Sequence, residues 1–204
     1  MSLPTTDAGV HLKPAMNSAE IDLYSVLLSR NRSVVDFSDP GTTLLAVRHR
    51  VKQLISVQAN PAFIATLRQI PQITEAEREE RLVFVQPDIG RTNAKGKPVD
   101  KKRRDDWPLY YTQVWTQMHG LVPDIVFING LFPTATALHA LEHITPDTQL
   151  LVMGGTRHHR IEALSHFCTL TDSVQSLAVY RPKKHIDTDL LHEIQGAVRY
   201  NRRA

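Results

Sequence analysis

Hydrophobic and polar positions along the chain form short apolar runs, separated by longer segments in which apolar residues recur every three or four positions. Short runs that end at polar or turn residues are typical of buried strands, and the three- to four-residue recurrence is typical of one face of a helix. The predicted strands span residues 34–36, 53–57, 82–85, 124–129, 150–153 and 176–180. Helices are predicted to begin near residues 17, 42, 60, 110, 133, 161 and 187, and 74–81 is predicted as an exposed helical turn or linker.

Strands that alternate with helices predict an α/β fold. We expect a doubly wound, mostly parallel Rossmann-like sheet with helices on both faces, and the last strand is the candidate for an antiparallel one. The predicted domain organisation is a flexible N-terminal arm over residues 1–16, followed by a single domain over 17–204. A long basic segment at about 89–108 interrupts the pattern and is predicted as a loop insertion.

The first predicted strand leads directly into a turn and a helix. Asp36 closes the apolar run, the residues at 38–41 are a dense turn signal, and Thr42 or Thr43 can cap the helix that follows. A βαβ unit of this kind places the N-terminus of a helix, with its free N–H groups, at the carboxyl edge of a parallel sheet. Ligands of such folds usually bind at that edge.

Composition and charge limit the possible partners. The 204 residues carry 24 basic and 21 acidic side chains, a balance that does not by itself indicate nucleic acid. The single Cys168 cannot form an internal disulfide and fits a reducing compartment. The first 14 residues contain no apolar segment typical of a signal peptide, and no apolar run approaches the roughly 20 residues that cross a bilayer. We therefore expect a cytoplasmic protein with no membrane or nucleic-acid partner.

Two further stretches carry a resemblance to a known family. Residues 88–99 read DIGRTNAKGKPV and residues 123–132 read PDIVFINGLF. They are similar, in the same order, to the DIGPTxxWGxPV and PDVVLVDGRFR stretches of a group of small bacterial methyltransferase-like proteins. Over roughly residues 20–183 the chain resembles the class I S-adenosylmethionine-dependent methyltransferase fold.

This resemblance implies a cofactor site on the first three strands. It places Asp36, Ser38, Gly41, Thr42 and Gln58 on the methionine–ribose side of S-adenosylmethionine. It places Asp88 on the adenine side. Two glycines of the family's turn are replaced by Ser38 and Pro40, and the family's ribose-binding glutamate is replaced by Gln58, which has one acceptor oxygen and no charge.

The resemblance also implies an acceptor site, which departs further from the family. Asn129 replaces an aspartate after the fourth strand, and Asn has no titratable group that could act as a base. Two arginines of the family are replaced by Leu131 and Pro133, and residues 154–156 replace an Asp-Asp-Tyr stretch. The candidate substrate-binding residues are Asn129, Arg157 and His158.

Two hypotheses follow from these matches and departures. The first is a methyltransferase that uses S-adenosylmethionine, with an unknown methyl acceptor. The second is a degenerate, non-catalytic member of the fold that binds another anionic small molecule or a protein partner. A weaker third is a glycan- or phosphate-handling enzyme that uses the arginines and histidines near residue 158.

Three other features are given structural explanations. His139 and His143 are four residues apart, but Ala140 stands where a metalloprotease motif requires glutamate, and a helical wheel directs both imidazoles to solvent. No metal is expected. Cys168 is predicted to be a small buried hydrophobe. The cations between Arg91 and Arg104 form either a solvated surface loop or a lid over an anionic ligand.

Overall fold

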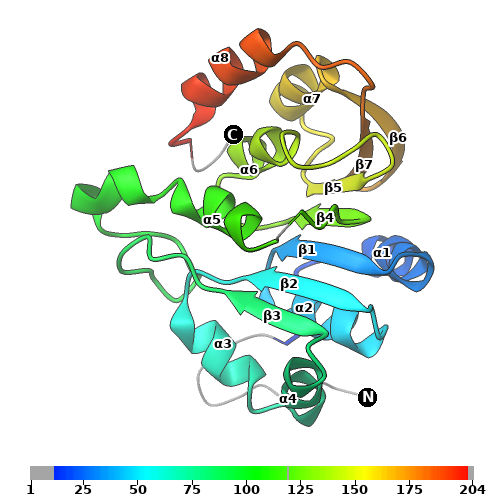
Figure 1. Cartoon of the computed structure of the whole chain (residues 1–204), viewed down its shortest axis with the longest axis vertical. Coiled ribbons are helices and arrows are strands. Elements are labelled where there is room, and N and C mark those ends of the chain that lie inside the picture. Colours follow the sequence, from blue (N-terminus) through cyan, green and yellow to red (C-terminus); the bar gives the residue numbers. More distant parts are fainter. Residues whose placement is uncertain (1–11, 119, 202–204) are drawn as a thin grey trace.

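A computed structural model describes residues 12–118 and 120–201, and within these residues seven strands form one sheet in the order β3-β2-β1-β4-β5-β7-β6 (Figure 1). The strands are β1 Ser33–Phe37, β2 Gln53–Val57, β3 Leu82–Val85, β4 Ile125–Ile128, β5 Gln149–Met153, β6 Cys168–Val174 and β7 Leu177–Pro182. The helices are α1 Ser18–Arg30, α2 Pro40–Arg48, α3 Pro61–Leu67, α4 Pro71–Arg78, α5 Leu109–Gln117, α6 Pro133–Ala140, α7 His158–Ser165 and α8 Thr188–Val198, with a 3₁₀ segment η1 at Lys101–Asp106.

Strands β1 to β5 are parallel, whereas β7 is antiparallel to both β5 and β6. Strand β1 is central: Val35 pairs with Ile55 of β2 on one side and with Val126 of β4 on the other. The predicted α/β class, the mostly parallel sheet and the antiparallel last strand are therefore confirmed.

The alternation of side chains along the strands divides the core into two layers. Val34 packs on one face with residues of α1, α2 and α4, and Val35 and Phe37 pack on the other with residues of α5 to α8. Successive residues of a strand point to opposite faces, so a strand covered by helices on both sides is apolar throughout. All five residues of β1 are buried.

The order of the strands creates a switch point between β1 and β4. The chain moves outward from β1 to β2 and β3, then returns to the other side of β1 to form β4. The segments that follow β1 and β4 therefore diverge, and the space between them is where open α/β sheets bind ligands.

Several local predictions were wrong. Strand β6 was not predicted, because its five central residues are exposed. Most of them are polar, so the sequence shows no apolar run of the kind that marks a buried strand. The cap of α2 is Asp39 rather than a threonine, with Pro40 in the first turn. Residues 71–78, of which 74–78 were predicted as a helical turn or linker, form the regular helix α4.

The predicted N-terminal arm lies partly outside the described residues. From residue 12 onward it packs on the domain, since Leu12 and Met16 are buried in the core layer of α1, α2 and α4. No helix within residues 12–118 and 120–201 combines the length and the apolar character that crossing a membrane requires.

Candidate functional site

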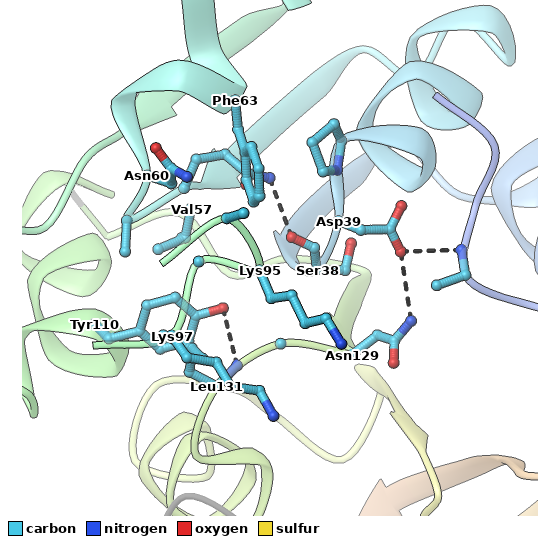
Figure 2. A pocket seen from close by; sticks show the side chains of 17 residues that line it. Ser38, Asp39, Val57, Asn60, Phe63, Lys95, Lys97, Tyr110, Asn129 and Leu131 are labelled. Carbon is cyan, nitrogen blue, oxygen red and sulfur yellow. Dashed lines mark hydrogen bonds between the residues drawn. The ribbon is translucent and has the colours of Figure 1, made fainter. Parts of the chain in front are cut away.

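A cavity of about 350 Å³ lies at the carboxyl edge of the sheet, over the ends of β1, β2 and β4 (Figure 2). Its walls come from segments far apart in the sequence that the switch point brings together. They are Ala15, residues 38–40 after β1, 57–60 after β2, Phe63 of α3, 94–97 of the basic loop, Tyr110 of α5 and 129–131 after β4. The predicted binding edge therefore holds an open space of the size that small ligands occupy.

Asp36 is close to this cavity in sequence but does not line it. Its side chain is fully buried, and its carboxylate accepts hydrogen bonds from the hydroxyls of Ser38, Thr42 and Thr43. The Thr43 hydroxyl also lies 2.8 Å from that of Ser56 on β2. Burial raises the pKa of Asp36 to about 7, against the lowering effect of the hydroxyl donors. Asp36 therefore anchors the turn from below.

Asp39 occupies the N-terminus of α2 that the sequence analysis assigned to a ligand. Its Oδ1 accepts the N–H groups of Gly41 at 2.8 Å and Thr42 at 3.2 Å. Its Oδ2 accepts the N–H of Ala15 at 3.2 Å and the Asn129 amide at 3.5 Å. The helix thus carries its own carboxylate, which also ties the N-terminal segment and the chain after β4 to the turn.

Gly41 permits this arrangement by having no side chain. A Cβ at position 41 would lie inside van der Waals distance of the backbone of Lys13 and Pro14. The N-terminal segment therefore covers the start of α2. Thr42 is fully buried, and neither Gly41 nor Thr42 is among the residues that line the cavity.

Gln58 does line the cavity and is held by two hydrogen bonds. Its Nε2 donates to the Ser38 carbonyl at 3.2 Å and to the Ser56 hydroxyl at 3.1 Å. The side-chain amide therefore joins the turn after β1 to β2. Of the six residues predicted to bind the cofactor, Ser38 and Gln58 reach the cavity.

Asp88 lies after β3 on the surface and is not among the lining residues. Its carboxylate accepts the Gly90 N–H at 3.1 Å and pairs with Arg103 at 2.8 Å. The Gly90 N–H and then the Arg103 guanidinium lower the pKa of Asp88. Arg103 also pairs with Asp106 at 2.7 Å, so Asp88 closes the base of the basic loop.

The basic loop is folded over the cavity. The side-chain oxygen of Asn93 accepts hydrogen bonds from the N–H groups of Lys95 at 2.9 Å and Lys97 at 3.0 Å. Thr92 and Pro98 form an antiparallel β-bridge. Gly96, with φ +74°, approaches the ring of Phe63 so closely that a Cβ would lie 3.3 Å from it. The tip of the loop therefore rests on α3.

Two lysines of this loop bring positive charge to the cavity. Lys95 and Lys97 both line it, and Figure 2 shows the Lys95 side chain directed toward Asn129. Asp39 is the acidic residue of the wall, and its two carboxylate oxygens already accept four hydrogen bonds. Among the described lining residues, the charge available to a ligand is cationic.

The chain after β4 closes the other side. The Tyr110 hydroxyl accepts the Leu131 N–H at 3.4 Å, and a Cβ on Gly130 would overlap that hydroxyl and lie 2.7 Å from the Phe37 carbonyl. Burial raises the pKa of Tyr110, which keeps its hydroxyl protonated. Asn129 and Gly130 are thus fixed between β1 and α5.

A smaller cavity of about 220 Å³ shares Asn129 and Gly130 with the first. Arg157 and Arg160 line it, together with Gly154 after β5. The Arg160 Nη1 donates to the Met153 carbonyl at 2.5 Å, and burial lowers the pKa of this guanidinium. His158, the third predicted substrate residue, is not among the lining residues, and its side chain is 96% exposed.

Two contributors to the site, Asn60 and Phe63, were predicted only as parts of a helix and not as binding residues. The position of Asn60 and Phe63 directly after a predicted strand was a usable signal, because that is where a parallel sheet presents its binding edge. The lid hypothesis for the basic loop already included the two lysines.

Comparison with known proteins supports the fold. No protein-family profile and no curated protein matches the sequence. Among solved structures, a methyltransferase-like protein from Silicibacter pomeroyi is similar over 91% of this chain and 97% of its own, with a TM-score of 0.72 and 20% identity. An O-methyltransferase from Bacillus cereus in complex with SAH is similar over 83% and 84%, with a TM-score of 0.53 and 13% identity.

The protein Rv0187 from MTB, solved with its cofactor, is also similar, over 84% of this chain and 83% of its own, with a TM-score of 0.54 and 14% identity. These likenesses show that the chain has a class I methyltransferase-like fold. The resemblance found in the sequence is confirmed at that level.

Proposed function

We propose that the protein binds S-adenosylmethionine in the cavity of about 350 Å³ and transfers its methyl group to an anionic small molecule. One observation carries this proposal: in a class I methyltransferase-like fold, the cavity lies over the ends of β1, β2 and β4, at the switch point where such sheets bind ligands. Two of the similar solved structures are described as holding SAH or a cofactor.

The residues of the cavity fit parts of such a cofactor. The ring of Phe63 offers an apolar surface to the adenine, and the side-chain oxygen of Gln58 can accept from a ribose hydroxyl. Lys95 or Lys97 can pair with the carboxylate of the methionine part. Asp36 and Asp88, which the resemblance assigns to this site, support it from outside the cavity wall.

When bound, S-adenosylmethionine supplies an electrophilic methyl group, and the protein contributes mainly by positioning the acceptor. Among the described lining residues of either cavity, no side chain is placed as a free general base. Asn129 does not titrate, and Asp39 is engaged by four donors. An acceptor that is already ionised needs no such base.

The smaller cavity fits an acceptor of this kind. It shares Asn129 and Gly130 with the main cavity, and Arg157, which does not line the main cavity, is part of its wall. A guanidinium binds carboxylate or phosphate groups through two parallel hydrogen bonds. We therefore assign the acceptor side to Asn129 and Arg157.

A second function is favoured by the charge of the main cavity. Its available charge comes from Lys95 and Lys97, and the carboxylates that bind ribose or adenine in the family are absent from its wall. A non-catalytic protein that binds another anionic small molecule, or a protein partner through this edge, would have the same charge.

Calorimetric titration with S-adenosylmethionine and SAH separates the two functions. We expect a dissociation constant on the order of 1–100 µM. Ala94→Trp fills the cavity from the exposed loop and should abolish the heat of binding. Ala65→Trp, on the exposed face of α3 outside the cavity, is the matched control and should bind as the natural chain does.

Absence of heat with either ligand at millimolar concentration would contradict the methyltransferase. The anion-binding function would then be tested with inorganic phosphate and citrate. Binding that is lost in Lys95→Gln/Lys97→Gln would support it, and the acceptor assignment would be tested by Arg157→Gln in a methyl-transfer assay with carboxylate acceptors.

A further inference from the structure

A group of imidazoles and one carboxylate lies away from both cavities, where the end of α6 meets α8. We call it the histidine cluster and define it as His139, Glu142, His143 and His192. Helices α6 and α8 contact each other, and Figure 1 shows α8 running beside α6. None of the four residues lines the cavity of about 350 Å³ or the cavity of about 220 Å³, so the cluster is independent of the proposed function.

The cluster brings its ligand atoms close together. One atom each of His139, Glu142 and His143 lies within 4.8 Å of the others. The Glu142 Oε1 lies 3.8 Å from the His139 Nδ1 and 3.8 Å from the His192 Nε2. Ligand atoms around a tetrahedral zinc ion are about 3.4 Å apart, so the ligand atoms of His139, Glu142 and His143 need to close by about 1.5 Å or less.

His139 of α6 and His143 of the turn that follows are held by aromatic side chains rather than directed freely to solvent. His143 stacks on Trp115 with ring centroids 4.7 Å apart, and His139 packs on Tyr111 at 5.7 Å. The helical-wheel argument against a metal is therefore wrong for His139, whose side chain is 20% exposed. Helix α6 ends at Ala140, and the turn that follows brings Glu142 to the same side.

Glu142 is fixed by a neighbour from α8. The Gln195 amide donates to the Glu142 carboxylate at 2.6 Å and to the Leu138 carbonyl at 3.2 Å. Hydrogen bonds of this kind orient carboxylate ligands in metal sites. A cavity of about 270 Å³, lined by His139, His192 and Gln195, gives an ion access from solvent.

We propose that the histidine cluster binds a divalent transition-metal ion of the zinc type, with His139, Glu142 and His143 as ligands from one segment and His192 as the ligand from α8. Imidazole and carboxylate together suit zinc, cobalt or nickel, whereas magnesium and calcium prefer oxygen ligands alone. The bound ion joins α8 to α6.

The test uses the full chain without a histidine tag, titrated with zinc chloride by calorimetry and with cobalt chloride by absorption. We expect one ion per chain, the intense visible bands of tetrahedral cobalt, and a higher melting temperature with zinc. His143→Ala and His192→Ala should each weaken binding by at least about tenfold. His185→Ala removes an exposed histidine outside the cluster and should leave binding unchanged.

Two results would overturn the proposal. One is the absence of zinc binding by the natural chain at millimolar concentration. The other is equal binding by the natural chain and His143→Ala, which would place any ion elsewhere. S-adenosylmethionine binding is measured on the same His143→Ala sample, so failure of the metal site and failure of the proposed function are distinguishable.

Discussion

Asp36 and Asp88 stand at the carboxyl end of β1 and just beyond that of β3, and the resemblance assigns both to one cofactor, yet they have opposite environments. Asp36 has no solvent exposure and is surrounded by hydroxyl donors. The Asp88 side chain is 75% exposed and pairs with Arg103. Burial raises the pKa of the first, while a backbone N–H and a guanidinium lower that of the second.

The difference shows that the strand end alone does not determine what an acidic residue does. Strand β1 is covered on both faces, so its terminal acid must be satisfied inside the protein. Strand β3 is an edge strand, and the residues after it are free to meet the basic loop. Asp36 supports the binding turn, and Asp88 fastens the loop that covers it.

The largest effect is expected from Asp36→Ala. It removes the carboxylate that accepts from three buried hydroxyls, of which Thr42 keeps the Asp39 carbonyl and Thr43 keeps the Ser56 hydroxyl, and it creates a small cavity. The free energy of unfolding should fall by about 3–5 kcal/mol. Asp88→Ala removes the same type of side chain at the surface and should cause no resolvable change in stability. Urea denaturation of both variants measures the contrast. Equal losses of stability in the two variants would contradict the distinction between a buried structural Asp36 and an exposed Asp88 that only holds the loop.

The second effect concerns the pH dependence of stability. Because Asp36 titrates near 3.8 in the unfolded chain and at about 7 in the folded protein, the folded state binds more protons between these values. Its contribution is complete below about pH 4 and is lost as the pH rises through about 7. Relative to Asp36→Asn, the natural chain should lose up to about 3 kcal/mol between about pH 5 and pH 7.

Urea denaturation of both proteins across this range measures the difference between their free energies of unfolding. Because all other titrating groups are common to both proteins, their contributions cancel in this difference. In Asp36→Asn the side-chain oxygen can still accept from Thr42 and Thr43, and the amide nitrogen that replaces the other oxygen can donate to the Ser38 hydroxyl. A constant difference between the two proteins over the range would show that Asp36 is ionised throughout.

The third effect extends the comparison to the glycine beside the turn. Gly41→Ala places a methyl group against the backbone of Lys13 and Pro14, so the N-terminal segment must move. We expect a loss of about 1–3 kcal/mol in the free energy of unfolding. Gly196→Ala is the matched control, because a Cβ there meets nothing within 4 Å on α8 and favours the helix by up to about 1 kcal/mol. Thermal unfolding of both variants checks the opposite signs.

The sheet was predictable because its strands are buried on both faces. Apolar runs such as 124–129 stand out from their surroundings, and their alternation with helical segments fixes the class of fold. Strand β6 lacked this signal: it is paired on one side, and its central residues are exposed. The turn after β1 and the carboxyl edge of the sheet were predicted correctly because both follow from where the apolar runs end.

The composition of the site was less predictable, because it depends on hydrogen bonds between distant residues. The predicted cap was Thr42 or Thr43, whereas Asp39 caps the helix and also accepts from Ala15 and Asn129, which only the folded chain brings to it. Likewise, only the folded loop shows that Arg103 holds Asp88. Local propensity does not include partners 15 or more residues away.

The smallest effect tests whether Asp88 can serve the ligand as well as the loop. Arg103→Gln removes the guanidinium that holds its carboxylate and leaves the Gly90 N–H contact in place. If the freed carboxylate turns to the adenine, affinity for S-adenosylmethionine should rise, by no more than about fivefold, because exposed ion pairs contribute little. The double variant Arg103→Gln/Asp88→Ala should lose that gain. A rise that persists in the double variant would instead assign it to loosening of the loop, and Asp88 would then act on the cavity only through the lysines that the loop carries.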